Sequence, residues 1–274
     1  MSRKQQGVVL WGTVSVMAAG FVLLLLELIK GGASLRQLTG VFFGSVIPTV
    51  GFAYTLLMQY SMRFYLFVSR LRSLAWADAP SWNLSATFEG DDILPEKIDQ
   101  VTQVLVARYK DRVVKSRRIA PMTREVVIPR GPNLEVHYNQ PVSFGVAEGK
   151  ASIQVRITNY HVGYRETKRA LEVHILPVLE AVGKALGGTS HRYSLTIEFD
   201  KGKNPFFGLV VAQLPPEAVS RFVVNLSPDP KSGESVLISE MKLAINTRSQ
   251  HTLRDRALEF LTFQPKLSAR MGHG

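Results

Sequence analysis

The stretches GVVLWGTVSVMAAGFVLLLL (residues 7–26) and QLTGVFFGSVIPTVGFAYTLLMQYSM (residues 37–62) contain no charged residue. A helix that crosses the hydrocarbon core of a bilayer needs about 20 predominantly apolar residues, and both stretches reach that length. A cleaved signal peptide has an apolar core of about 7–15 residues and fits the first stretch less well. Because the connection between the stretches is short, we expect a two-helix transmembrane hairpin with a membrane-exit helix over residues 1–76.

Basic residues near the ends of membrane helices favour the cytoplasmic side, so they predict orientation. They precede the first stretch and follow the second, although two also lie between the stretches: Arg3, Lys4, Arg63, Arg70 and Arg72 against Lys30 and Arg36. We therefore predict a multi-pass protein of the inner (cell) membrane with both termini in the cytoplasm. The chain has no cysteine, which excludes disulfides, thiolate zinc sites and cysteine nucleophiles.

Small and polar residues recur along one face of the second stretch. Their spacing of three and four residues matches a helical repeat, and small residues allow two helices to approach closely. Two interpretations stay open, namely packing of the second span on the first and contact between subunits around a pore. The candidate residues for a pore or an oligomer interface are Gly40, Gly44, Ser45, Pro48, Thr49, Gly51 and Thr55.

Residues 77–274 contain no comparable apolar stretch, and we expect them to form a soluble, cytosolic sensor domain. Apolar alternation predicts strands over residues 82–89, 125–128, 134–138, 151–160, 193–199, 208–214, 221–226 and 236–245. Helical periodicity predicts about three helices, over residues 94–110, 164–186 and 252–263. This order is typical of an α+β domain with a mostly antiparallel sheet. The sequence strand–helix–strands occurs twice, which leaves a degenerate duplication open.

The net charge of +11 is distributed unevenly, because residues 108–130 alone hold eight basic and two acidic residues. Guanidinium groups suit phosphate oxygens, so this segment is the main candidate for binding an anionic nucleotide or short oligonucleotide. A solvated surface and docking on anionic lipid headgroups are the other interpretations. Its candidate ligand-binding residues are Arg108, Lys110, Arg112, Lys115, Arg117 and Arg118.

A second basic and aromatic group begins the helix predicted over residues 164–186. Cations in a first helical turn oppose the helix dipole, and a bound phosphate would remove that conflict. Alternatively, Glu166 and Glu172 balance the charge and the tyrosines are structural. The candidate ligand-binding residues in this group are Tyr160, His161, Tyr164, Arg165, Lys168 and Arg169.

Signatures of catalysis are weak. The six histidines show no spacing that would pair two metal ligands, and there is no Gly-x-Ser-x-Gly motif or dinucleotide fingerprint. Residues 200–208 (DKGKNPFFG) read as a turn and lack the Walker pattern. Glu198 and Asp200 share a strand face, which leaves a membrane-tethered metal nuclease as a minor alternative. We predict no enzyme, no catalytic residue, no metal and no cofactor.

The hairpin of residues 7–26 and 38–62, followed by a domain with the basic segment 108–130, resembles the two-span membrane effectors of prokaryotic antiphage defence. It is most similar to the channel-type effector of the Hailong system, whose partner enzyme makes short deoxyadenylate oligomers. The resemblance is one of architecture and transfers no functional residue.

It implies a homo-oligomeric membrane effector, an ion channel or pore gated by a nucleotide or oligonucleotide signal on the cytosolic domain. It also implies a signal-synthesising partner enzyme. The main alternative is a non-catalytic membrane adaptor or scaffold that recruits a protein partner.

Overall fold

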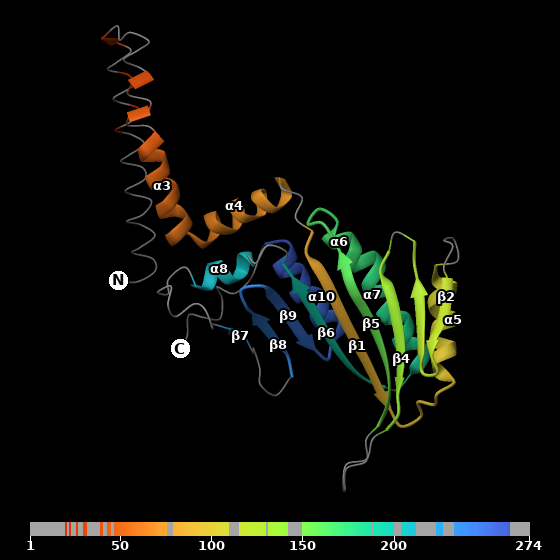
Figure 1. Cartoon of the computed structure of the whole chain (residues 1–274). Coiled ribbons are helices and arrows are strands. Elements are labelled where there is room, and N and C mark those ends of the chain that lie inside the picture. The colour runs from red at the N-terminus through yellow and green to blue at the C-terminus, as the bar shows by residue number, and fades with distance from the viewer. Residues whose placement is uncertain are drawn as a thin grey trace. The chain divides into compact units, whose positions relative to one another are not determined.

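The structure is a computed structural model, shown in Figure 1, and it divides the chain into two compact units, Met1–Leu71 and Arg72–Gly274. It describes residues 47–75, 79–109, 115–129, 131–141, 150–187, 189–199, 204–211, 223–226 and 233–263. It also describes a few positions in the first unit: Gly20, Val22, Leu26, Lys30, Gly31, Thr39, Gly40, Phe43 and Gly44.

The first unit holds helix α3 (Ile47–Tyr60), and helix α4 (Met62–Ala75) follows it along the chain. In the part of the chain that the structure describes, no helix is both long enough and apolar enough to cross a membrane. Arginines interrupt the apolar character of α4, which contains Arg63, Arg70 and Arg72.

The predicted fold class, a transmembrane hairpin ahead of an α+β domain, is therefore wrong, and so is the predicted membrane location. The predicted channel function stays a prediction. The predicted first span lies outside the described residues except at Gly20, Val22 and Leu26. Of the residues predicted to line a pore or an oligomer interface, Ser45 lies outside the described residues. The others lie in described helical positions, and the Thr55 hydroxyl donates a hydrogen bond of 2.9 Å to the Gly51 carbonyl.

The second unit is built on one nine-stranded sheet in the order β2-β3-β4-β5-β1-β6-β9-β8-β7, with every neighbouring pair antiparallel. The strands are β1 (Ser81–Gly90), β2 (Lys115–Ala120), β3 (Thr123–Val127), β4 (Asn133–Asn139), β5 (Ala151–His161), β6 (Ser190–Glu198), β7 (Val224–Leu226), β8 (Ser235–Ile238) and β9 (Lys242–Thr247). The long strands β1 and β6 meet at the middle of the sheet, and both outer strands are short.

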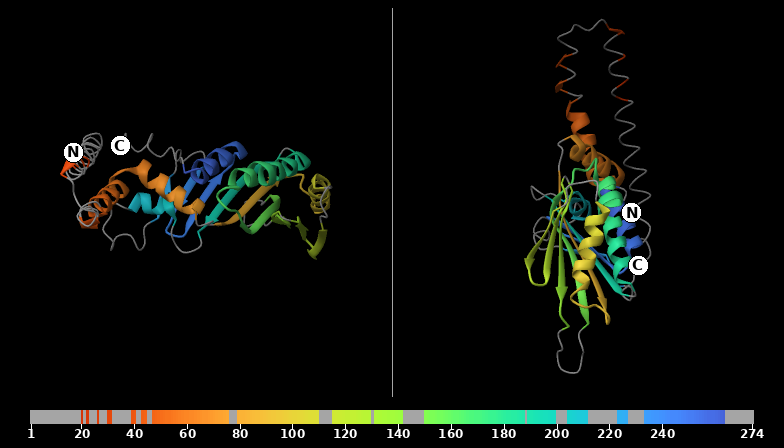
Figure 2. Two further views of the ribbon diagram at one scale, coloured as in Figure 1. Left: turned by 90° about the horizontal axis from the view of Figure 1, so that it is seen from above. Right: turned by 90° about the vertical axis from the view of Figure 1, so that its right-hand side faces the viewer.

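Helices cover one face of this sheet (Figure 2). They are α5 (Lys97–Arg108), the continuous run α6 (Thr167–Arg169), η2 (Ala170–Ile175) and α7 (Leu176–Leu186), and then α10 (Gln250–Leu261). A further helix, α8 (Pro205–Val211), follows β6 along the chain. The second unit thus repeats one order twice: a long central strand, a helix, a run of antiparallel strands, and a closing helix. We call β1–β5 with α5 to α7 the first half, and β6–β9 with α8 and α10 the second half.

Strand alternation explains the core. In β1, Trp82, Leu84 and Phe88 are almost fully buried toward the helices, and the intervening residues point to the opposite face. The face that carries Ser85 and Ser194 is called the open face below, because α5, α7 and α10 all pack on the other side. Apolar residues on one face and polar residues on the other are what a half-covered antiparallel sheet requires.

Four predicted elements differ from the structure. The single strand predicted over residues 236–245 is instead the antiparallel pair β8 and β9. Residues 208–211 of the strand predicted over 208–214 belong instead to helix α8, because the Asn204 side chain caps the chain there and Phe206 is buried among other aromatic rings. Residues 212–214 lie outside the described residues. The basic segment contains strand β2 rather than only a loop. The helix expected from residue 164 begins with three α-helical residues and then becomes π-helical over Ala170–Ile175.

Candidate binding surface

Strand β2 forms one edge of the sheet, and all six of its side chains are exposed. It pairs with β3 on its inner side, and within the described residues no strand pairs with its outer side. A two-residue turn, Pro121 and Met122, joins it to β3. The guanidinium of Arg124 holds this turn, because Nη1 donates to the carbonyls of Ala120 (3.4 Å) and Pro121 (3.1 Å). The sequence thus places a basic strand where its backbone is accessible.

The charges on and beside β2 are only partly balanced. Arg117 forms an ion pair with Glu125 on β3, and Arg124 forms one of 2.8 Å with Asp99 on α5. Lys115 and Arg118 have no ion-pair partner among the residues that the structure describes. Two exposed cations on this edge therefore have no neutralising acid within the described part of the chain.

The remaining predicted residues of the basic segment do not extend this surface in the structure. Arg108 is exposed in the last turn of α5, where a cation complements the helix dipole. Lys110 and Arg112 lie outside the described residues.

The second predicted cluster lies at the end of β5 and the start of the helix run, and much of it has structural partners. The ring of Tyr164 packs on Phe263 at 5.1 Å, and Arg165 Nη2 donates to the Leu74 carbonyl at 3.4 Å. His161 Nδ1 lies 3.4 Å from the Ala79 carbonyl oxygen. Tyr160 is half-buried, and Lys168 and Arg169 are exposed. The helical run begins at Thr167, and no side chain caps its N-terminus by a hydrogen bond.

The two predicted clusters do not form one site. Strands β3 and β4 lie between β2 and β5, and three strand spacings of about 4.8 Å separate their axes by about 14 Å. A single phosphate group cannot contact both clusters. Of the twelve predicted ligand-binding residues, β2 brings Lys115, Arg117 and Arg118 together.

The open face carries a row of residues in register that the sequence analysis did not identify. From β2 to β8 the row reads Arg117, Glu125, Glu135, Arg156, Ser85, Ser194, Asn246 and Ser235. Charged residues occupy its first four positions and neutral polar residues the other four. The alternation of strands β3 to β5 could have indicated these charges, but only once the pairing register was known.

A chain of polar contacts crosses β3 and β4 next to this row. The hydroxyl of Thr123 lies 3.1 Å from His137 Nδ1, and His137 Nε2 lies 3.2 Å from a carboxylate oxygen of Glu135. All three side chains are on the open face, because Thr123 and His137 are register partners and Glu135 is two residues from His137.

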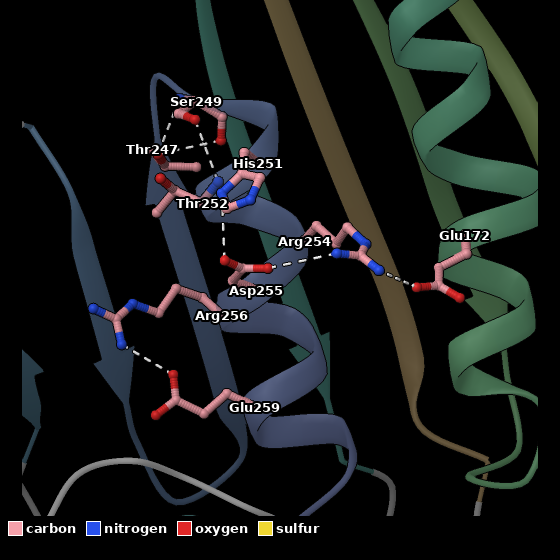
Figure 3. Close-up of polar contacts among 9 residues, drawn as sticks. All are labelled: Glu172, Thr247, Ser249, His251, Thr252, Arg254, Asp255, Arg256 and Glu259. Atoms are coloured by element: carbon pink, nitrogen blue, oxygen red, sulfur yellow. Dashed lines mark hydrogen bonds and ion pairs between the residues drawn. The ribbon is translucent and has the colours of Figure 1, made fainter.

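Another polar cluster, drawn in Figure 3, joins the two halves on the helix side. Arg254 on α10 contacts Glu172 on η2 at 2.6 Å, and Asp255 lies 3.8 Å from the same arginine. The hydroxyl of Ser249 accepts a hydrogen bond from the Thr252 amide and caps α10. Each charge drawn there has an opposite charge beside it, which indicates a structural role.

Burial shifts the acid–base behaviour of two groups where the halves meet. It lowers the pKa of His191 and raises the pKa of Tyr193, since burial disfavours each charged form. Both rings pack edge-on against Phe88, with centroid separations of 5.1 and 6.2 Å. Tyr193 belongs to the core, and His191 is half-buried beside it.

The described residues contain no group of three histidine, aspartate or glutamate side chains placed to hold a metal ion. Glu198, weighed in the sequence as part of a metal site, forms an ion pair of 2.8 Å with Lys242. Its sequence neighbour Asp200 lies outside the described residues.

No family model and no curated protein matches this chain. Among solved structures, Methanococcus jannaschii TBP matches at 13% identity over 69% of this chain and 98% of its own, with a TM-score of 0.24. M. kandleri SerRS in complex with A. aeolicus tRNASec matches at 13% identity over 69% of this chain and 32% of its own, with a TM-score of 0.25. These likenesses carry no argument about function, and the resemblance to antiphage effectors stays a prediction.

Proposed function

We propose that the second unit is an adaptor that binds an extended, acidic segment of a partner protein as an added strand beside β2. One observation carries this proposal: β2 is an edge strand whose six residues are all exposed, it is basic, and its outer side is unpaired within the described residues. Addition of a strand to a sheet edge is a recurring mode of peptide recognition.

The backbone of β2 supplies the general part of the binding energy. Amide and carbonyl groups of successive residues in a strand point to alternate sides, so about half of the six residues direct theirs outward. Each hydrogen bond to a partner strand contributes about 0.5–1.5 kcal/mol after exchange with water. Ile119, which is exposed, adds apolar surface on the same edge.

The side chains of β2 favour an acidic partner over a second copy of this chain. Two β2 strands side by side would bring basic residues opposite each other, and like charges on paired strands are destabilising. Basic residues on an edge strand therefore prevent self-pairing. An acidic strand gains from the same charges, since Lys115 and Arg118 lack an acidic neighbour among the described residues.

The test is binding of a labelled acidic peptide of about eight residues to the full-length protein. The peptide repeats Val-Glu-Glu-Val, so that glutamates lie on both faces of the added strand, as Lys115 and Arg118 do on β2. Two further peptides of the same sequence carry N-methyl groups on every second amide. One peptide is methylated at the odd positions and the other at the even positions. Strand addition predicts that one phase abolishes binding and the other is tolerated, because only one set of amides faces β2. Equal affinity for all three peptides would rule out strand addition.

A pair of matched variants tests the role of charge. Lys115→Glu with Arg118→Glu should weaken peptide binding by about tenfold or more, because two attractive contacts become repulsive. Lys168→Glu with Arg169→Glu makes the same change of net charge on α6 and should leave the affinity within about twofold. Equal losses in both variants would indicate only a long-range charge effect.

Short single-stranded oligonucleotides at physiological salt form the competing arm. The sequence predicts such a ligand for the basic segment, and that prediction is untested. Binding of an oligonucleotide that exceeds peptide binding and is lost in the β2 variant would replace the adaptor function with recognition of an anionic signal. Binding that only follows length and disappears with salt would reflect positive charge alone.

A further inference from the structure

The contacts of Thr123, His137 and Glu135 have the connectivity of a hydroxyl–imidazole–carboxylate chain. Thr123 Oγ1 lies 3.1 Å from His137 Nδ1, and His137 Nε2 lies 3.2 Å from Glu135 Oε2. Both distances lie within about 2.6–3.2 Å, the range for a nucleophile next to a base that a third group orients. The sheet itself fixes this geometry, because Thr123 and His137 are paired across β3 and β4.

The donor and acceptor roles of the three groups determine which way the protons point in these contacts. An ionised carboxylate can only accept hydrogen bonds, so the Glu135 contact requires the proton of the neutral imidazole to be on Nε2. His137 Nδ1 is then a hydrogen-bond acceptor, and the Thr123 hydroxyl must be the donor. This is the arrangement in which an imidazole can remove a hydroxyl proton, with its ring held by the carboxylate.

The Thr123–His137–Glu135 contacts are accessible to a reactant from one side of the sheet. They lie on the open face, whereas the helix that packs on β3 and β4, α5, covers the opposite face. The side chains of His137 and Glu135 are 22% and 34% exposed, so they are partly desolvated without being closed off. Neighbouring charges are balanced, since Glu125 opposite Glu135 is paired with Arg117, and Arg156 lies opposite Glu135 on β5.

We propose that Thr123 is a nucleophile for acyl transfer, with His137 as its general base and Glu135 as the positioning residue, acting on an ester or thioester acyl donor. As Thr123 Oγ1 bonds to the acyl carbon, His137 Nδ1 takes the hydroxyl proton. That proton then passes to the departing alcohol or thiol as its bond to the acyl carbon breaks. The product is an acyl ester of Thr123, which water hydrolyses with the same base to a carboxylic acid.

This activity goes beyond the proposed adaptor function and involves different residues. The adaptor proposal depends on the outer edge of β2, and the acyl-transfer proposal on the open face of β3 and β4. Failure of one therefore leaves the other standing.

The experiment treats the full-length protein with p-nitrophenyl acetate and maps acetylated positions by mass spectrometry. The expected adduct is on the peptide that contains Thr123, and Thr123→Val should abolish it. His137→Gln should slow its formation at least about a hundredfold, the contribution typical of a positioned base. Thr87→Val is the matched control, because Thr87 lies on the open face of β1, opposite Gln154 rather than in the chain of contacts. In the Thr87→Val variant, Thr123 should be acetylated at the same rate as in the unmodified protein.

Glu135→Gln tests the positioning role without removing a large side chain. It should slow acetylation about tenfold or more while the thermal midpoint stays nearly unchanged. The ¹⁵N resonances of the His137 ring give a readout independent of activity, because they report which nitrogen carries the proton. We expect the Nε2–H tautomer, and Glu135→Gln should mix the two tautomers.

Acetylation confined to lysines or to other hydroxyls, or an unchanged adduct in Thr123→Val, would overturn the proposal. A predominant Nδ1–H tautomer in the unmodified protein would also overturn it, because Nδ1 could then not accept the hydroxyl proton.

Discussion

The two halves of the sheet share one order of elements, yet their open faces differ in charge. In the first half the register row carries Arg117, Glu125, Glu135 and Arg156, and the edge strand is basic. In the second half the corresponding positions are neutral, with Ser194, Asn246 and Ser235. Strand pairing and the covered face are alike in both, so the scaffold does not set this chemistry. Side chains on the open face can therefore differ between the halves with little effect on the packing of the core.

The halves also differ in how they are held together. In the first half α5 packs on β3 and β4 and on α7, and its N-terminus has no side-chain cap. In the second half Asn204 caps α8, and Phe206 packs on Phe199, Phe260 and Phe263. If the two halves unfold as one cooperative structure, substitutions where β1 meets β6 should lower the unfolding free energy most. Substitutions within one half should lower it less.

The largest expected effect is that of Phe88→Ala, where the halves meet. Phe88 on β1 is fully buried and contacts the rings of His191 and Tyr193 on β6. Removing a buried ring leaves a cavity and costs about 3–5 kcal/mol of unfolding free energy. Urea unfolding followed by circular dichroism of the sheet measures this loss. Phe88→Leu keeps most of the volume and is the control, with a smaller expected loss.

The same variant tests whether the two halves unfold together or independently. A single transition with an unchanged slope against urea concentration supports one cooperative sheet. Two transitions, with only one shifted by Phe88→Ala, would show that each half unfolds separately.

A smaller effect is expected for Asn204→Ala, which acts within the second half. The buried Asn204 amide donates to the carbonyls of Ser239 (3.0 Å) and Lys242 (3.1 Å), and its oxygen accepts from the Phe206 amide (2.9 Å). Alanine would remove these hydrogen bonds at a cost of about 2–3 kcal/mol. The Lys242 carbonyl would still accept the hydrogen bond of the Ser239 amide (2.9 Å).

Glu96→Ala is the matched variant at the start of α5 in the first half, where no side chain caps the helix. It should change the unfolding free energy by less than about 0.5 kcal/mol. Hydrogen exchange should show the loss in Asn204→Ala first in α8 and β9. A loss of the same size in Glu96→Ala would contradict the difference in capping between the halves.

Sequence patterns identified the central elements well because their signals are local. Alternation over residues 82–89 and 151–160 corresponds to β1 and β5, and helical periodicity corresponds to α5 and α10. The helix α8 was missed because PFFGLVV is rich in residues that favour strands, and its cap and aromatic partners come from distant parts of the chain. The membrane prediction was wrong because, among the described residues, no helix is both long enough and apolar enough to cross a membrane.

The candidate surface was harder to predict than the elements. Clustered arginines in the segment 108–130 indicated an exposed basic region, and Lys115, Arg117 and Arg118 do lie on exposed β2. The sequence could not show that Glu125 neutralises Arg117 or that Asp99 neutralises Arg124, because these pairs depend on strand register and on helix docking. The Thr123–His137–Glu135 chain was missed for the same reason, since its members are 14 and 2 residues apart.

The smallest expected effect concerns pH and returns to the place where the halves meet. Burial lowers the pKa of His191 from its ordinary value of 6.5, so below that pH the unfolded chain binds a proton that the folded protein resists. Stability should therefore fall as the pH is lowered from about 7.5 to about 5.5, and His191 should contribute to this fall.

His191→Gln removes the titrating group and retains polar atoms near Thr189 and the Tyr193 hydroxyl, so its unfolding free energy should depend less on pH. His251→Gln, at an exposed position on α10, is the control and should leave the pH dependence of the unmodified protein. If His191→Gln and His251→Gln behave alike, the ring beside Phe88 is hydrated, and packing there is looser than its contacts indicate.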